Sequence, residues 1–84
     1  MLTLKIVSPE RVEFDGNVIS VKVPGTMGSF EVLDNHAPII SSLEKGVVEY
    51  TTTDKEKRQL NIFGGFVEVQ KNVVSLCVEI YDNE

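Results

Sequence analysis

The fold class is decided by residues 66–80, which read FVEVQKNVVSLCVEI. Two apolar runs flank Lys71-Asn72, and every second residue from Val74 to Ile80 is apolar. Side chains of a strand point to opposite faces in turn, so this period of two predicts strands with one buried face. Asn tolerates the left-handed geometry of a two-residue turn. The stretch therefore predicts two strands joined by a tight turn at Lys71-Asn72.

Three further parts of the chain repeat the period of two. Apolar side chains stand at every second position in 2–6, 19–23 and 60–62. Residues 37–44 could form one helical turn, but β-branched Ile39 and Ile40 favour a strand or an irregular path. No segment has a sustained period of 3.6 residues. The sequence therefore predicts an all-β domain, either a sandwich or a barrel of short strands.

Turn-forming residues separate the apolar runs. Residues 8–10 end the first run, and Asp15-Gly16 is a strong signal for a hairpin turn. Pro24-Gly25 closes the next strand, and residues 54–57 predict a polar hairpin tip. Gly64-Gly65 predicts a strand junction or bulge, where the backbone takes positive φ or makes a close contact.

The composition fits one small globular domain rather than a disordered chain. The chain has 84 residues, of which 42% are apolar and 25% are charged. A net charge of −5 argues against a nucleic-acid partner and against direct adsorption to anionic lipid. No apolar run approaches the ~20 residues of a membrane span. Met1 to Ser8 alternates instead of forming a signal-peptide core. We therefore expect membrane association only through another protein.

Few residues are suited to catalysis or metal binding. The single cysteine, Cys77, excludes an internal disulfide, and we interpret it as a small apolar filler of a cytoplasmic protein. We interpret His36, the single histidine, as a structural residue that bonds backbone in a loop rather than one that transfers protons. Gly64-Gly65 lacks the spacing of a phosphate loop. We predict no catalytic residue, no cofactor and no metal site.

The segment from Pro24 to Pro38 is the best candidate for a partner-binding edge. It mixes Gly and Pro with apolar residues in a loop, and binding residues are concentrated on loops. We interpret Phe30 as a core residue. Met27 lies in a glycine-flanked turn and is expected to be exposed, because Met is adaptable and common on contact surfaces.

Six segments, in this order, make the chain recognisable. They are IVSPE at 6–10, FDGNV at 14–18, VPGTMGSFEVL at 23–33, NHAPII at 35–40, LEKGVV at 43–48 and GGFVEVQKNVV at 64–74. Together they resemble the N-terminal domain of the epsilon subunit of F-type ATP synthase, called delta in mitochondria. The resemblance runs from Leu4 to about Val78. Each segment alone is weak, but their order and spacing are specific.

This resemblance implies a single domain over residues 1–84, a β-sandwich of about ten strands in two five-stranded sheets. It implies a rotor subunit without an active site, in contact with the gamma subunit and the membrane c-ring, that couples ion flow to ATP synthesis. Such a subunit is peripheral, on the cytoplasmic face of the bacterial plasma membrane, and we expect a monomer in isolation. A free-standing β-sandwich adaptor is the alternative.

The resemblance also implies contact residues, carried over where the motif matches. Expected contacts with the c-ring are Thr26, Met27, Gly28, Ser29 and Phe30. Expected contacts with the gamma subunit are Ser8, His36, Ser41 and Ser42. Many relatives have an acidic residue where Ser29 stands, which puts an ion pair to the ring in doubt. Most relatives also continue into a pair of inhibitory helices, and from the end at Glu84 we expect no such helical domain.

Overall fold

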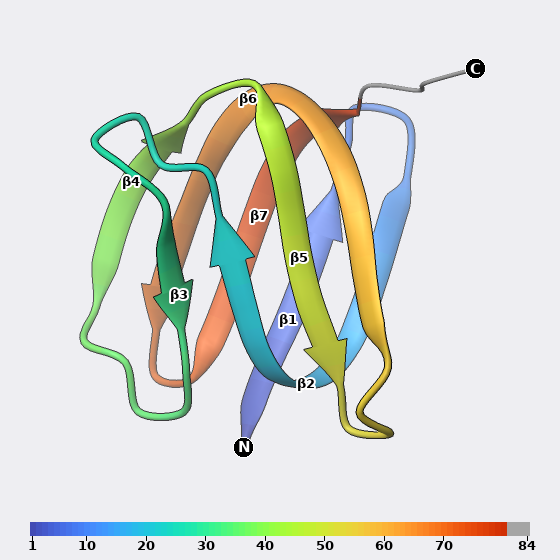
Figure 1. The fold of residues 1–84 in the computed structure, drawn as a ribbon, viewed down its shortest axis with the longest axis vertical. Helices are drawn as coiled ribbons and strands as arrows, with labels where there is room; N and C mark the ends of the chain where they lie inside the picture. The colour runs from blue at the N-terminus through green and yellow to red at the C-terminus, as the bar shows by residue number, and fades with distance from the viewer. Residues whose placement is uncertain (81–84) are drawn as a thin grey trace.

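Seven strands make up the part of the chain that the computed structural model describes, residues 1–80 (Figure 1). They are β1 (Leu2–Val7), β2 (Val12–Val23), β3 (Phe30–Val32), β4 (Ile39–Leu43), β5 (Gly46–Thr52), β6 (Lys57–Gln70) and β7 (Val73–Ile80). Residues 1–80 contain no helix, so none that could span a membrane. The all-β prediction is confirmed, and residues 37–44 contain a strand in place of a helical turn. Residues 81–84 of the expected domain lie outside this description.

Five of the strands close into a ring of neighbours. The order is β1-β7-β6-β5-β2, and β2 pairs with β1 again to complete the ring. The β1–β7 pair is parallel, and the other named pairs are antiparallel. The two short strands are edges: β3 pairs with the end of β2, and β4 pairs with β6. All strands therefore belong to one hydrogen-bonded sheet.

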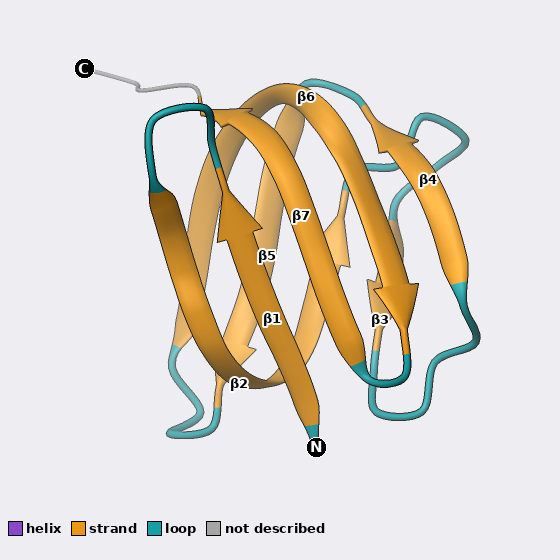
Figure 2. Ribbon diagram, turned by 180° about the vertical axis from the view of Figure 1, so that it is seen from behind, coloured by secondary structure: helices purple, strands orange, loops and turns teal. Residues whose placement is uncertain are grey.

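The ring is folded into two layers. The front layer consists of β3, the second half of β2, β5 and the first half of β6, and it faces the viewer in Figure 1. The back layer consists of β4, the second half of β6, β7, β1 and the first half of β2, as Figure 2 shows from behind. The long strands β2 and β6 serve both layers. Their bends carry the chain from one layer to the other.

The expected ten strands in two five-stranded sheets are therefore wrong in count and in connection. Seven strands in one sheet form the two layers among residues 1–80. The reason is the length of β2 and β6, with 12 and 14 residues, because each continues through the bend without a break. A register shift between Ile62 and Gly64 marks the bend in β6. The prediction of a bulge at Gly64-Gly65 is confirmed.

The predicted hairpin turn at Asp15-Gly16 is also wrong. Both residues lie inside β2, where Gly16 pairs with Leu4. The turn between β1 and β2 lies earlier, closed by a 2.9 Å hydrogen bond from the Ser8 N–H to the Arg11 carbonyl. Gly16 is adjacent to the ring of Phe14, which an added Cβ would approach to 3.3 Å. Gly16 therefore leaves room for the Phe14 ring inside a strand, although Asp-Gly in a sequence is typical of a turn.

The predicted turn at Lys71-Asn72 is confirmed, and Gly65 shows the close contact expected at the Gly64-Gly65 bulge. Lys71 and Asn72 form the two-residue turn between β6 and β7, with φ of 52° and 61°. Gly65 has φ of 147°, and a Cβ there would overlap the carbonyl oxygen of Cys77 on β7. Only glycine permits this close approach of β6 to β7. It is the approach that lets one strand turn from the front layer to the back layer.

The core lies between the two layers. Alternate side chains of most strands point inward and exclude water, as the pattern of period two predicts. Ile19 is an exception: a register shift between Val18 and Ser20 buries Val18 and leaves Ile19 exposed, although the pattern placed Ile19 on the buried face. The largest fully buried side chains are Leu2, Leu4, Ile6, Ile62, Leu76, Val21, Val23, Val32, Val48, Val67, Val69 and Val74. Phe14, Phe30, Leu60 and Ile80 pack against this cluster. The other half of each alternating run is therefore presented on an outer face.

Candidate functional site

A groove between the two edge strands brings most of the expected contact residues together. In the described sheet β3 pairs with β2 and β4 with β6, and β4 contacts the loop before β3 through a bridge between Leu43 and Gly25, so the space between β3 and β4 is open. We call this space, of about 520 Å³, the edge groove. It is lined by Met27, Gly28, Ser29, Phe30, His36, Ile39, Ile40 and Ser41. Expected ring contacts and expected gamma contacts thus share one groove.

Hydrogen bonds tie the loop before β3 to the end of β4. The Thr26 N–H donates to the Ser42 carbonyl at 3.1 Å, and the Oγ atoms of these residues lie 2.9 Å apart. The Glu44 N–H donates to the Pro24 carbonyl at 2.9 Å. Thr26 and Ser42 were expected to contact different partners, yet they contact each other. This end of the edge groove is therefore closed by the protein itself.

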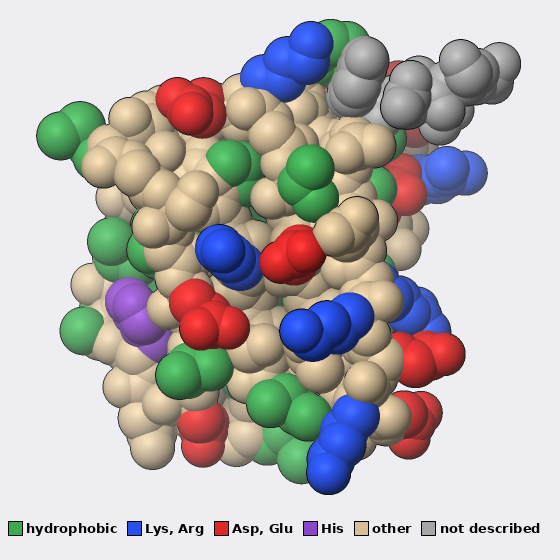
Figure 3. Space-filling model, in the orientation of Figure 1, with side chains coloured by type: hydrophobic (Ala, Val, Ile, Leu, Met, Phe, Trp, Pro, Cys, Tyr) green, Lys and Arg blue, Asp and Glu red, His purple; other side chains and the backbone are tan. Residues whose placement is uncertain are grey.

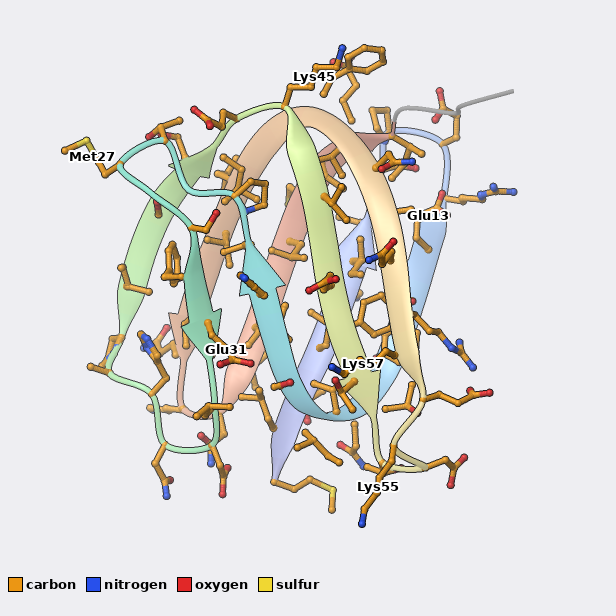
Figure 4. All side chains as sticks on the ribbon, viewed as in Figure 1. Glu13, Met27, Glu31, Lys45, Lys55 and Lys57 are labelled. Carbon is orange, nitrogen blue, oxygen red and sulfur yellow. The ribbon has the colours of Figure 1, made fainter. Side chains whose placement is uncertain are left out.

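The side chains of this loop differ sharply in exposure. Met27 is 97% exposed and, in Figure 4, its side chain points away from the ribbon, so the prediction that it is exposed is confirmed. Phe30, interpreted as core, is half-buried: it packs against the core and also lines the edge groove. Across the groove Ile40 is 74% exposed. The groove thus has Phe30 as an aromatic wall and Met27 and Ile40 as exposed apolar side chains, a combination suited to protein contact rather than to catalysis.

His36 has the structural contacts predicted for it. Its Nδ1 lies 2.7 Å from the Ala37 carbonyl oxygen, which can only accept, so Nδ1 carries the proton. The His36 N–H donates to the Leu33 carbonyl at 3.2 Å. The imidazole lies beside Phe30, with ring centroids 6.4 Å apart. The histidine thus holds the loop between β3 and β4 and forms part of the groove wall.

Ser8 is the one expected contact residue that lies apart from this group. It lies in the β1–β2 turn, where its Oγ accepts a hydrogen bond from the Arg11 N–H at 3.3 Å. There it lines a shallow hollow of about 350 Å³ together with Val7, Cys77 and Glu79. Ser8 and the edge groove therefore lie at opposite sides of the back layer.

A row of apolar side chains crosses the back layer between these two places. The register pairs Ser42 with Phe66, Phe66 with Cys77, Cys77 with Val7, and Val7 with Val12. Paired residues of neighbouring strands point to the same face. Phe66 is 51% and Val12 54% exposed, whereas Val7 and Cys77 are half-buried. We call Phe66, Cys77, Val7 and Val12 the back row.

Sequence reasoning missed the back row, although one signal was present. In the run FVEV, Phe66 shares the phase of Glu68 and thus the outward face, an unusual place for a large aromatic side chain. Pairing with three other strands, which no local pattern predicts, then places other apolar side chains beside it. Cys77, interpreted as a filler, lies on this outer row instead of in the core.

The outer face of the front layer has a different chemistry. Glu31, Lys22, Glu49 and Gln59 follow one another across β3, β2, β5 and β6 in register. The Gln59 Nε2 donates to Glu49 Oε2 at 2.7 Å. Figure 3 shows the resulting alternation of Lys and Arg with Asp and Glu over this face. Opposite charges in neighbouring positions neutralise one another, so the face is suited to water.

The rest of the described chain offers little for chemistry. Residues 1–80 contain no group of three or more His, Cys, Asp or Glu side chains that could hold a metal ion. At the far hairpin, a hydrogen bond from Arg58 to Glu56 and a second interaction with Tyr50 raise the pKa of the Arg58 guanidinium. This keeps an exposed cation charged and activates no nucleophile.

Comparison with known protein families gives a match that covers nearly the whole chain. The family model of the ATP synthase delta/epsilon chain, β-sandwich domain, matches residues 1–82. The chain belongs to this family. The family resemblance read from the sequence is thereby confirmed, and so is the β-sandwich class.

Curated relatives are ATP synthase epsilon chains of bacteria. The chain is 40% identical over 78 residues to that of Leptospira borgpetersenii, which covers 93% of this chain and 61% of the relative. It is 40% identical over 77 residues to that of Chlorobaculum tepidum, which covers 92% of this chain and 88% of the relative. The chain thus spans about three fifths of the Leptospira protein and most of the Chlorobaculum protein.

Solved structures share the fold. One chain of the Euglena gracilis mitochondrial ATP synthase (OSCP/F1/c-ring) matches 92% of this chain with a TM-score of 0.86 and 23% identity, over 49% of its own length. One chain of the Tetrahymena thermophila mitochondrial ATP synthase (central stalk/c-ring) matches 96% of this chain with a TM-score of 0.78 and 16% identity, over 66% of its length. At these identities the likeness concerns the fold alone.

Proposed function

We propose that the domain is a non-catalytic contact module in the rotor of an F-type ATP synthase. In this role it joins the gamma subunit to the c-ring, and it helps to transmit rotation between ion flow and ATP synthesis. Membership of the delta/epsilon family supports the proposal, as do the central stalk and c-ring assemblies that hold chains of the same fold. The gamma subunit and the c-ring hold the domain at the membrane, and in a bacterium this is the cytoplasmic face of the plasma membrane.

The observation that carries the proposal is the difference between the two outer faces. The front face carries a ladder of neighbouring opposite charges and polar groups, with Val47 exposed beside it, whereas the back face exposes the continuous apolar back row. Burying a half-exposed Phe such as Phe66 contributes about 1 kcal/mol or more to association. Hence the back layer gains more from contact with a partner than the front layer does.

We place the two partners on two different surfaces. It lies between Ser8 and Ser42, the outermost of the expected gamma contacts, so we place the gamma subunit on the back face. Met27, the most exposed large apolar side chain of residues 1–80, and its loop 26–30 form an exposed corner at the Thr26–Ser42 end of the edge groove. We place the polar loops of the c-ring at this corner.

Co-purification with the gamma subunit tests the proposal with a matched pair of variants. Phe66→Asp puts a charge on the back face, and Val47→Asp puts the same charge on the front face at a side chain of similar exposure, 42%. We expect Phe66→Asp to weaken gamma binding about tenfold or more, which corresponds to about 1.4 kcal/mol. Val47→Asp should leave binding unchanged. Equal effects of the two variants, or no gamma binding by the wild type, would overturn the assignment.

A further inference from the structure

Asn72 links three parts of the chain that are far apart in sequence. It lies in the β6–β7 turn, and its carbonyl accepts a 2.9 Å hydrogen bond from the Thr3 N–H of β1. Its side-chain Oδ1 accepts a 2.7 Å hydrogen bond from the Asn35 N–H, and its Nδ2 donates to the Asn35 Oδ1 at 3.4 Å. The side-chain amide of Asn72 thus clasps the loop that connects β3 to β4.

The clasped loop forms one end of the edge groove. Asn35 immediately precedes His36, whose ring lies beside Phe30 in the groove wall. The opposite end is closed by the bonds between Pro24 or Thr26 and the end of β4. Between these ends β3 and β4 share no ladder, so ties at the two ends set their separation. The back layer supplies the Asn72–Asn35 clasp and, at the adjacent residue, an exposed 3.4 Å ion pair between the Met1 amino group and Asp34.

The geometry points to Asn72 as a positioning residue for binding of the c-ring loops at the edge groove. It lines no part of the groove, and it acts through Asn35 on the position of His36. Without the clasp, the loop samples conformations in which the groove is not formed. The apparent affinity of a partner then falls in proportion to the population of the formed groove. This inference rests on the proposed function, because it needs a partner at the groove.

The backbone of the turn allows a clean substitution. Asn72 has φ of 61° and Lys71 has φ of 52°, both in the left-handed region that Gly adopts readily. Asn72→Gly therefore preserves the turn and removes both side-chain hydrogen bonds. Lys71→Gly makes the same backbone change one residue earlier and preserves the clasp, so it is the matched control. Asn72→Asp retains the acceptor for the Asn35 N–H and is the rescue variant.

The first test uses the isolated domain and needs no partner. In Asn72→Gly we expect hydrogen exchange of the Asn35 amide to rise about tenfold or more, with core amides such as Leu76 unchanged. His36 is the single histidine, so its ring resonances are unambiguous. They should lose the ring-current shift that the neighbouring Phe30 causes. Lys71→Gly and Asn72→Asp should resemble the wild type. Unchanged exchange of Asn35 in Asn72→Gly would overturn the inference.

The second test measures affinity for the reconstituted complex of gamma subunit and c-ring. We expect Asn72→Gly to weaken binding about three- to tenfold, and Asn72→Asp and Lys71→Gly to bind like the wild type. If Asn72→Gly binds normally while Met27→Asp binds weakly, the positioning role is overturned and the proposed function stands. If the wild-type domain does not bind at all, the proposed function fails and the inference fails with it.

Discussion

The Oγ atoms of Thr26 and Ser42 lie 2.9 Å apart and join the loop before β3 to the end of β4. These two residues belong to the sets expected to contact the c-ring and the gamma subunit. Their direct contact joins the two sets, apart from Ser8, in one continuous surface around the edge groove.

Thr26→Val tests this link, because it removes the hydroxyl and retains the shape of the side chain. An exposed neutral hydrogen bond contributes about 0.5–1.5 kcal/mol, so we expect a loss of unfolding free energy in that range. Hydrogen exchange of amides 26–30 should become faster, since the loop loses one of its ties. Urea unfolding and exchange measured by NMR check both. Thr53→Val in the distant hairpin is the control, and equal exchange in the two variants would contradict the prediction.

Met27→Asp should weaken attachment to the c-ring and leave the domain folded. Met27 is 97% exposed and contributes nothing to the core, so the unfolding free energy should change by less than about 0.5 kcal/mol. Phe30→Asp should behave differently, because Phe30 packs on the core and its replacement should also destabilise the domain. The measurements are thermal unfolding and proton-driven ATP synthesis in the assembled enzyme. Normal coupling in Met27→Asp would contradict our placement of the ring.

Gly65→Ala should destabilise the domain strongly. A methyl group there overlaps the Cys77 carbonyl, and the backbone has a positive φ of 147°. Positive φ and overpacking each cost about 1–3 kcal/mol, so we expect a loss of about 3 kcal/mol or more. Gly28→Ala separates the two causes, because φ is 126° but nothing lies within 4 Å of the added methyl. Urea unfolding should rank Gly28→Ala between the wild type and Gly65→Ala.

Cys77 should report on docking at the back face. It is the single cysteine, it is half-buried, and it lies in the back row between Phe66 and Val7. We expect a maleimide to label the free domain and the gamma subunit to slow that labelling about tenfold or more, because bound gamma excludes the reagent. Mass spectrometry measures the rate. In a Cys77→Ala background, Thr53→Cys should label at the same rate with and without gamma. Unprotected Cys77 in the complex would contradict docking on the back face.

Much of the fold could be predicted from local pattern. The period of two located β1, the second half of β2, parts of β6 and β7 with most of their buried faces, and the left-handed tolerance of Asn located the Lys71-Asn72 turn. The Gly64-Gly65 pair located the bend of β6, because only Gly fits there. Gly16 misled for a related reason: glycine serves packing against Phe14 as well as turns, and the sequence does not distinguish these uses.

The candidate site was predicted only as separate segments. The motifs named the loop 26–30 and the residues Ser8, His36, Ser41 and Ser42, but not their arrangement. The structure brings all but Ser8 to the edge groove or its hydrogen-bonded end. The Asn72–Asn35 clasp joins residues 37 positions apart. No periodic signal could have predicted this pair of hydrogen bonds, since Asn is common in turns whether or not its side chain bonds another loop.

The sequence by itself determined most of the buried side chains and the turns at Pro24-Gly25, 54–57 and Lys71-Asn72, because alternation and turn chemistry act over a few residues. It also determined the family, through the order of six segments. Only the tertiary structure decided that seven strands form one folded sheet and that the back row lies between Ser8 and Ser42. The physical reason is that register between distant strands fixes which outward side chains become neighbours, and that register follows from packing of the whole core.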